Sequence, residues 1–133
     1  MPYSSANGVK MYYEVSGEGR PFVFVHATPF DHNLFLYQVS HFSTTFKTIA
    51  VDMRGSGRSE KPTEEFSIGD LAKDVMGVCR DEGVKEAILL SASVGSGIAP
   101  WLALNHPAMF MALILVVGAL KPQAHFPRPE DIS

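Results

Sequence analysis

Short apolar runs alternate with helical segments along most of this chain, and this order limits the possible folds more than any other feature of the sequence. Runs typical of strands occur at Phe22–Val25, Lys47–Val51, Ala87–Leu90 and Leu113–Val117. Helices are expected between them, over 33–42, over 68–82 and up to about Asn105. Strands that alternate with helices predict an α/β domain with a doubly wound, mostly parallel sheet. An antiparallel hairpin is expected to precede it, with its turn at Asn7-Gly8 and a strand over Val9–Val15.

The helix expected over 68–82 carries the clearest local signals. Ser67 is a suitable N-cap, and Asp70 follows three residues later, as in a capping box. Apolar side chains recur at helical spacing on one face, and Gly83 provides a stop signal. Cys79 lies on that apolar face, so we expect its thiol to be buried and unreactive.

Composition excludes several classes of protein. The chain has 133 residues, of which 46% are hydrophobic and 19% charged, which is typical of a globular domain. Its net charge of −3, without a basic run, predicts neither a nucleic-acid nor an anionic-membrane partner. A single cysteine excludes an internal disulfide framework. No secretory signal is visible, and the longest apolar run, 109–120, is shorter than the roughly 20 residues of a membrane helix, so we expect a cytoplasmic protein.

A serine that follows the strand over 87–90 carries the strongest chemical signal. A serine on a sharp strand-to-helix turn needs small residues two positions before and after it, because side chains there crowd each other. Around Ser93 those positions hold Ser91 and Gly95, whereas the neighbouring serines have at least one bulky residue there. Such a turn exposes the hydroxyl and directs the next backbone N–H, that of Val94, at an oxyanion. Ser93 is therefore the candidate nucleophile.

With this turn, the chain resembles the α/β-hydrolase family, and two further motifs carry the resemblance. Residues 26–29 (His-Ala-Thr-Pro) are similar to the family's His-Gly-x-Pro oxyanion loop, with Ala27 in place of Gly. Residues 52–59 fit the family's Asp-x-Arg-Gly-x-Gly-x-Ser turn at every fixed position. The resemblance implies that the N–H groups of Thr28 and Val94 form the oxyanion hole, and that the 52–59 turn has a structural role.

The resemblance covers roughly residues 8–119, which correspond to the first half of a family domain. We therefore expect 1–120 to be the N-terminal half of an α/β-hydrolase domain, with a sheet truncated after its sixth strand. Residues 121–133 are expected to be a Pro-rich linker toward an absent lid region. The family's chain order of Ser, acid and His places the catalytic acid and histidine outside this chain. A substitute triad with His125 and the acidic residues that follow it is the less favoured alternative.

The last expected strand would leave an open sheet edge. An apolar strand at such an edge promotes aggregation unless something covers it. We expect a C-terminal half chain to cover this edge, with a homo-oligomer of this chain as the alternative.

The remaining polar candidates are interpreted as structural. His26 is expected to shape the oxyanion loop through hydrogen bonds, and Asp31 to cap the following helix or to contact substrate. His32 and His41 are expected at the surface. No pair of histidines has metal-ligand spacing with carboxylates, so we expect neither a metal nor another cofactor.

The resemblance implies a serine hydrolase that acts on a small ester, lactone or C–C substrate through an acyl-enzyme on Ser93. The family's haloalkane dehalogenases and epoxide hydrolases carry Asp at the nucleophile position, so Ser93 argues against those activities. A cofactor-free haloperoxidase-like activity at the same serine is an alternative within the family. A non-catalytic binding module or an inactive fragment with the same fold is the alternative from another class.

Overall fold

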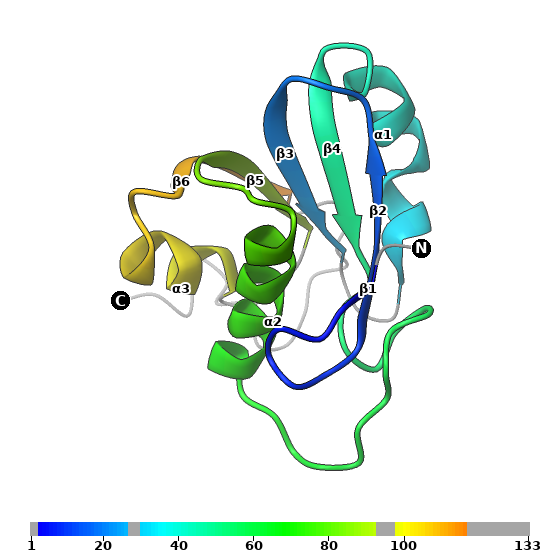
Figure 1. The fold of residues 1–133 in the computed structure, drawn as a ribbon, viewed down its shortest axis with the longest axis vertical. Helices are drawn as coiled ribbons and strands as arrows, with labels where there is room; N and C mark the ends of the chain where they lie inside the picture. The colour runs from blue at the N-terminus through cyan, green and yellow to red at the C-terminus, as the bar shows by residue number, and fades with distance from the viewer. Residues whose placement is uncertain (1–2, 27–29, 93–97, 117–133) are drawn as a thin grey trace, which may run out of the picture.

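Six strands form one sheet in the order β1-β2-β4-β3-β5-β6 (Figure 1). The computed structural model describes residues 3–26, 30–92 and 98–116. Within them the strands are Tyr3–Ser4 (β1), Met11–Ser16 (β2), Arg20–Val25 (β3), Phe46–Val51 (β4), Ala87–Ala92 (β5) and Phe110–Val116 (β6). The helices are the 3₁₀ helix His32–Phe35 (η1), followed by Leu36–Phe42 (α1), Ile68–Asp81 (α2) and Ile98–Asn105 (α3).

The larger part of this sheet is parallel, as the alternation of strands and helices predicted. Strands β4, β3, β5 and β6 run parallel to one another. By contrast, β1 pairs with β2, and β2 with β4, in antiparallel orientation. In the centre, Phe22 on β3 pairs with Thr48 on β4 and with Ile88 on β5. The expected α/β class and the mostly parallel, doubly wound sheet are confirmed.

Strand β3 is buried on both faces, which explains its unbroken apolar sequence. Val23 and Val25 pack into a core with α2 and α3, while Phe22 and Phe24 pack into a second core with η1 and α1. Successive side chains of a strand point to opposite faces, so this one run contributes to both cores. The sheet is thus packed between two helical layers.

Helix α2 begins and ends where the sequence predicted. The Ser67 side chain accepts a hydrogen bond from the N–H of Asp70, and the Asp70 carboxylate accepts one from the N–H of Ser67, which completes the capping box. Gly83 follows the helix with φ +70°, a conformation that favours glycine. Cys79 is fully buried on the inner face, as expected, and burial raises the pKa of its thiol to about 12.

The prediction of a two-residue hairpin at Asn7-Gly8 was wrong. Ser4 pairs with Met11, so a longer connection joins β1 to β2, and β2 starts two residues later than Val9. Tertiary contacts account for the difference: the Asn7 amide donates a hydrogen bond to Asp74 on α2, and Val9 is buried in the core.

Strand β6 begins earlier than the sequence predicted and lies at one edge of the described sheet. It starts at Phe110 rather than near Leu113, because Phe110 is buried and pairs with Ala87. Further along β6, Met111, Ile114 and Leu115 are exposed. Across the described ranges, no helix has the length and apolar character that crossing a membrane requires.

Candidate functional site

Two neighbouring strands lead into the two stretches of sequence that carry the candidate chemistry. Strands β3 and β5 are parallel, and Val25 pairs with Ser91, so the carboxyl ends of both strands lie side by side. The candidate nucleophile Ser93 and the candidate oxyanion donors Thr28 and Val94 come directly after these ends, and all three lie outside the described residues. The carboxyl ends of parallel strands are the usual place for a ligand site in an α/β sheet.

His26, the first residue after β3, has the structural role expected of it. The ring is buried, and its Nε2 accepts a hydrogen bond of 2.9 Å from the backbone N–H of Met53. This bond joins the start of the expected oxyanion loop to the end of the adjacent strand β4.

Asp52, at the end of β4, is the centre of a hydrogen-bond network. Its carboxylate is fully buried and accepts bonds from the backbone N–H groups of His32 (2.7 Å) and Arg58 (2.9 Å). Its backbone carbonyl accepts a bond of 2.6 Å from the Ser59 hydroxyl. Gly57, with φ +51°, passes so close that a Cβ there would overlap the carboxylate. These contacts support the structural role that the resemblance implied for the 52–59 turn.

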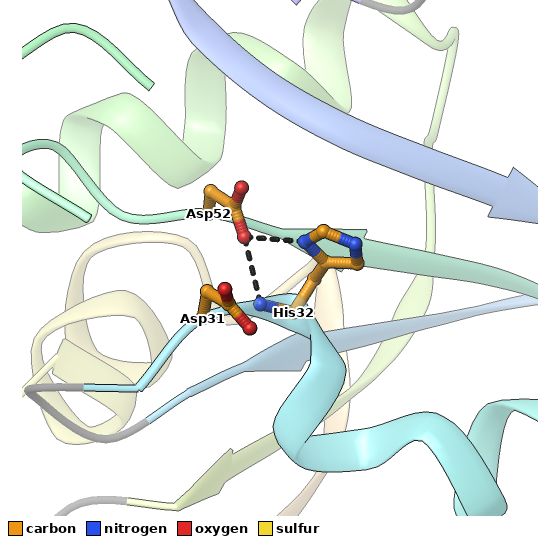
Figure 2. A group of neighbouring side chains, drawn as sticks. All are labelled: Asp31, His32 and Asp52. Carbon is orange, nitrogen blue, oxygen red and sulfur yellow. Dashed lines mark hydrogen bonds and ion pairs between the residues drawn. The ribbon is translucent and has the colours of Figure 1, made fainter. Parts of the chain in front are cut away.

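The prediction that His32 is a surface residue was wrong. Only 12% of its side chain is exposed, and both ring nitrogens have partners. Nδ1 lies 2.7 Å from Asp52 Oδ1, and Nε2 lies 3.2 Å from Glu14 Oε2 on β2 (Figure 2 shows the Asp52 contact). No sequence pattern predicts this arrangement, because His32 and Asp52 are 20 positions apart and belong to different parts of the fold. His41 on α1 is exposed, as predicted.

Asp31 caps the 3₁₀ helix. Its side chain accepts a hydrogen bond of 2.8 Å from the backbone N–H of Asn33, which matches one of its two expected roles. Polar atoms of Asp31, His32 and Asp52 lie within 4.8 Å of one another, close enough to surround a cation (Figure 2). However, Asp52 Oδ1 already accepts the His32 backbone N–H and faces the His32 ring nitrogen. A metal ion there would have to displace those contacts, so the cluster is better described as a hydrogen-bond network.

Glu14 and Tyr12 extend this network along β2. The Tyr12 hydroxyl donates a hydrogen bond of 2.5 Å to Glu14, which raises the pKa of Tyr12 because ionisation of the phenol would break that bond. The Arg58 guanidinium lies over the Tyr12 ring, 5.2 Å from its centre. The Tyr12 and His32 rings lie 5.5 Å apart, so this group of side chains joins β2, β4 and η1.

A buried ion pair holds the 52–59 turn against α2. Arg54 donates two hydrogen bonds to the fully buried Asp74, of 2.6 and 2.9 Å, and the bond to this carboxylate raises the pKa of the guanidinium. Asn7 donates a third hydrogen bond to the same carboxylate. Asp74 on α2 therefore joins the turn after β4 to the β1–β2 connection.

A separate, shallow pocket of about 500 Å³ lies at the amino ends of the parallel strands β3 and β5. It is bordered by Arg20 and Pro21 at the start of β3 and by Lys85 and Glu86 just before β5. These residues lie at the amino ends of the parallel strands, so the pocket is at the other end of β3 and β5 from Val25 and Ala92.

Residues 20–132 match the family model described as alpha/beta hydrolase fold, which covers most of the chain. The chain belongs to the α/β-hydrolase fold family. This confirms the family that the motifs at 26–29, 52–59 and 91–95 indicated.

Relatives within this α/β-hydrolase family have several named activities. The AB hydrolase superfamily protein YisY of Bacillus subtilis (strain 168) is 32% identical over 115 residues, which cover 86% of this chain and 43% of that protein. A non-heme haloperoxidase of Rhodococcus erythropolis is 29% identical over 129 residues, which cover 92% of this chain and 45% of that protein.

Solved structures of similar proteins agree with this fold. Est816, described as an N-acyl homoserine lactone degrading enzyme, has a TM-score of 0.81 and 36% identity, covering 86% of this chain and 44% of that one. An epoxide hydrolase from Bacillus megaterium has a TM-score of 0.80 and 31% identity, covering 85% of this chain and 40% of that one. This chain therefore spans less than half the length of each of these relatives.

Proposed function

We propose that the protein is a serine hydrolase in which Ser93 is the nucleophile. The pairing of Val25 with Ser91 is the observation that carries the proposal. Because of this pairing, the stretches 26–29 and 91–95 are reached from the neighbouring carboxyl ends of β3 and β5. Membership of the α/β-hydrolase family and the strand–turn–helix sequence around Ser93 support it further. The N–H groups of Thr28 and Val94 are the proposed oxyanion donors.

The proposed reaction proceeds in two steps. Ser93 Oγ bonds to the acyl carbon while its proton passes to a histidine, and the N–H groups of Thr28 and Val94 donate hydrogen bonds to the oxyanion. The histidine then gives this proton to the leaving group as the acyl bond breaks. Water attacks the acyl-enzyme, loses a proton to the same histidine and releases the acid, after which Ser93 regains its proton. The histidine and its acidic partner come from outside this chain.

A small ester or lactone is the proposed substrate class, with C–C cleavage as a further possibility. Similarity to Est816, a lactone-degrading enzyme, supports this choice. The resemblance to the family implies Asp at the nucleophile position of its epoxide hydrolases, so the proposed Ser93 nucleophile argues against epoxide hydrolysis, although an epoxide hydrolase is among the similar structures.

A C-terminal half chain is the proposed partner, and it would pair with the edge of β6 that faces no other strand among the described residues. Exposed apolar side chains on β6 support this proposal. It is also supported by the observation that this chain spans less than half the length of each relative. Such a chain would also supply the catalytic acid and histidine. A homo-oligomer that covers the same edge is the alternative.

A fluorophosphonate probe tests the proposed nucleophile. The protein as purified, with every chain that accompanies it, is treated with the probe, and intact masses are measured. We expect one adduct on this chain, because the probe reacts with a serine only when a base activates it. Ser93→Ala should abolish the adduct, whereas Ser40→Ala, on the exposed surface of α1, should retain it.

The outcomes separate the proposal from its rivals. Folded wild-type protein that remains unlabelled would contradict the serine-hydrolase proposal and favour a binding module or an inactive fragment. If wild-type protein reacts with the probe, untreated protein is assayed for both activities. Formation of peracid from acetate and hydrogen peroxide faster than ester hydrolysis would favour the haloperoxidase-like alternative, which the similarity to the Rhodococcus non-heme haloperoxidase suggests.

A further inference from the structure

The Asn7-Gly8 sequence lies in the connection between β1 and β2, and it has a chemical property besides its place in a turn. An asparagine that precedes glycine is prone to deamidation, because glycine has no side chain to hinder attack by its own backbone nitrogen. Gly8 is exposed and has φ +84°, in the left-handed region that favours glycine. The turn therefore favours the very residue that makes Asn7 reactive.

The connection around Asn7 packs directly against α2 (Figure 1). The Asn7 side-chain amide donates a hydrogen bond of 2.8 Å to Oδ1 of Asp74, which is fully buried. Three residues further along α2, a Cβ on Gly77 would lie 3.1 Å from Ala6 Cβ and 3.4 Å from the backbone nitrogen of Asn7. The Asn7 amide thus makes a polar link at a place where the backbone of the connection closely approaches the helix.

The charges at this link suit a neutral donor and not a second anion. Arg54 donates to both oxygens of Asp74, and its Nη2 shares Oδ1 with the Asn7 amide. Arg54 balances the one negative charge of Asp74, while Asn7 adds a hydrogen bond without adding charge. A carboxylate in place of the Asn7 amide would face Asp74 with no hydrogen to donate, and two carboxylates so close together repel each other.

We propose that Asn7 is a deamidation site, and that its deamidation releases the β1–β2 connection from α2. The backbone nitrogen of Gly8 bonds to Asn7 Cγ, and the side-chain nitrogen leaves as ammonia together with the proton that Gly8 loses. Water then opens the resulting cyclic imide. Attack of water at Cγ gives aspartate, whereas attack at the backbone carbonyl gives isoaspartate, which also lengthens the backbone by one methylene group. Both products carry a negative charge that the amide lacked.

The fold restrains this reaction, and the product opposes a return to the attached state. Before the attack, the Asn7 amide has to leave Asp74, and the Gly8 N–H has to leave the Ser5 carbonyl, which it contacts at 3.0 Å. The reaction therefore proceeds while the connection is detached from α2, through a local opening of the native protein. Afterwards the new carboxylate is repelled by Asp74, so deamidation converts a brief opening into a lasting one.

Incubation of the protein as purified in mildly alkaline buffer tests the reaction. Peptide mass mapping locates each deamidated residue, and Asn33 and Asn105, which precede leucine and histidine, are internal controls. We expect deamidation at Asn7 alone, about tenfold slower in native protein than in protein unfolded in urea, because the native hydrogen bonds hold both reacting groups. Native protein that keeps Asn7 intact while unfolded protein loses it would overturn the proposal, as would equal rates in the two states.

Asn7→Asp reproduces the charge of the product and tests the release. We expect trypsin to cleave after the exposed Lys10 several-fold faster in Asn7→Asp than in wild type, because α2 no longer holds the connection. Asn33→Asp adds the same charge at an exposed position of η1 and is the matched control, with cleavage at the wild-type rate. Asn7→Ser, which keeps a neutral donor, should also remain close to wild type. Equal cleavage of Asn7→Asp and Asn33→Asp would show that the added charge does not release the connection, and the proposal would fail.

Discussion

Asp74 joins three separate segments of the chain. It is fully buried on α2, and it accepts hydrogen bonds from Arg54 in the turn after β4 and from Asn7 in the β1–β2 connection. A buried carboxylate is stable only when it is paired and hydrogen-bonded, and here three N–H donors meet that need. One side chain of a distant helix therefore helps to orient the 52–59 turn.

Asp74→Asn is expected to destabilise the fold by about 3 kcal/mol, because it leaves the Arg54 charge buried without its counter-ion. Urea unfolding of the protein as purified measures the change. Asp81→Asn is the matched control: it removes the same charge from the exposed last residue of α2 and should change the free energy of unfolding by less than about 0.5 kcal/mol. Equal effects of the two substitutions would show that the ion pair contributes nothing specific.

At the scale of elements, α2 shows how local signals determine a helix. The capping box satisfies backbone N–H groups that the first turn leaves without partners, and the apolar side chains recur on the inner face. The backbone N–H of Ser67 lowers the pKa of the Asp70 carboxyl. A lowered pKa means that this contribution is present at neutral pH and is lost as the pH falls through the lowered value.

Ser67→Ala should therefore destabilise the fold by about 1 kcal/mol at pH 7, since it removes the acceptor for the Asp70 N–H. Ser67→Asn, which keeps a side-chain acceptor at the cap, should lose only a fraction of this. Chemical unfolding at pH 7 compares the two variants. If the alanine variant is as stable as the asparagine variant, the cap is not a source of stability.

The sequence predicted the elements better than their contacts, for a physical reason. Periodicity and caps are local, so the helix over 68–82 and the strands around 22–25 and 87–90 were identified within a few residues. The start of β6 depends on the burial of Phe110 opposite Ala87, and the connection around Asn7 depends on Asp74; neither partner is close in sequence.

The candidate site was predictable only as far as its motifs extend. The resemblance identified the family and gave a role to the 52–59 turn, but the contact of His32 with Asp52 follows no sequence period. The proposed roles of Ser93, Thr28 and Val94 stay predictions, because these residues lie outside the described part of the chain.

For the molecule as a whole, the position of β6 at the edge of the described sheet leads us to expect a partner chain. Parallel pairing with β5 satisfies one side of this strand, and apolar side chains remain exposed along it. Unpaired edges of this kind associate with other strands. The proposed partner would thus bury the edge of the described sheet.

Native mass spectrometry of the purified material tests this expectation. We expect this chain, of 14.5 kDa, in complex with a second polypeptide that carries the catalytic histidine and acid. A complex that contains only copies of this chain would favour the homo-oligomer instead. A folded, monodisperse monomer of this chain would contradict both.

The strand order also has a consequence for synthesis on the ribosome. The innermost strand, β3, is made early, but Phe22 on it pairs with Ile88, which leaves the exit tunnel only after about 66 further residues. Synthesis proceeds at roughly 5–20 residues per second, so several seconds pass between the synthesis of β3 and that of β5, one of its two neighbouring strands. The apolar strand β3 therefore stays partly exposed on the nascent chain until β5 has been made, and we expect molecular chaperones to bind there during that time.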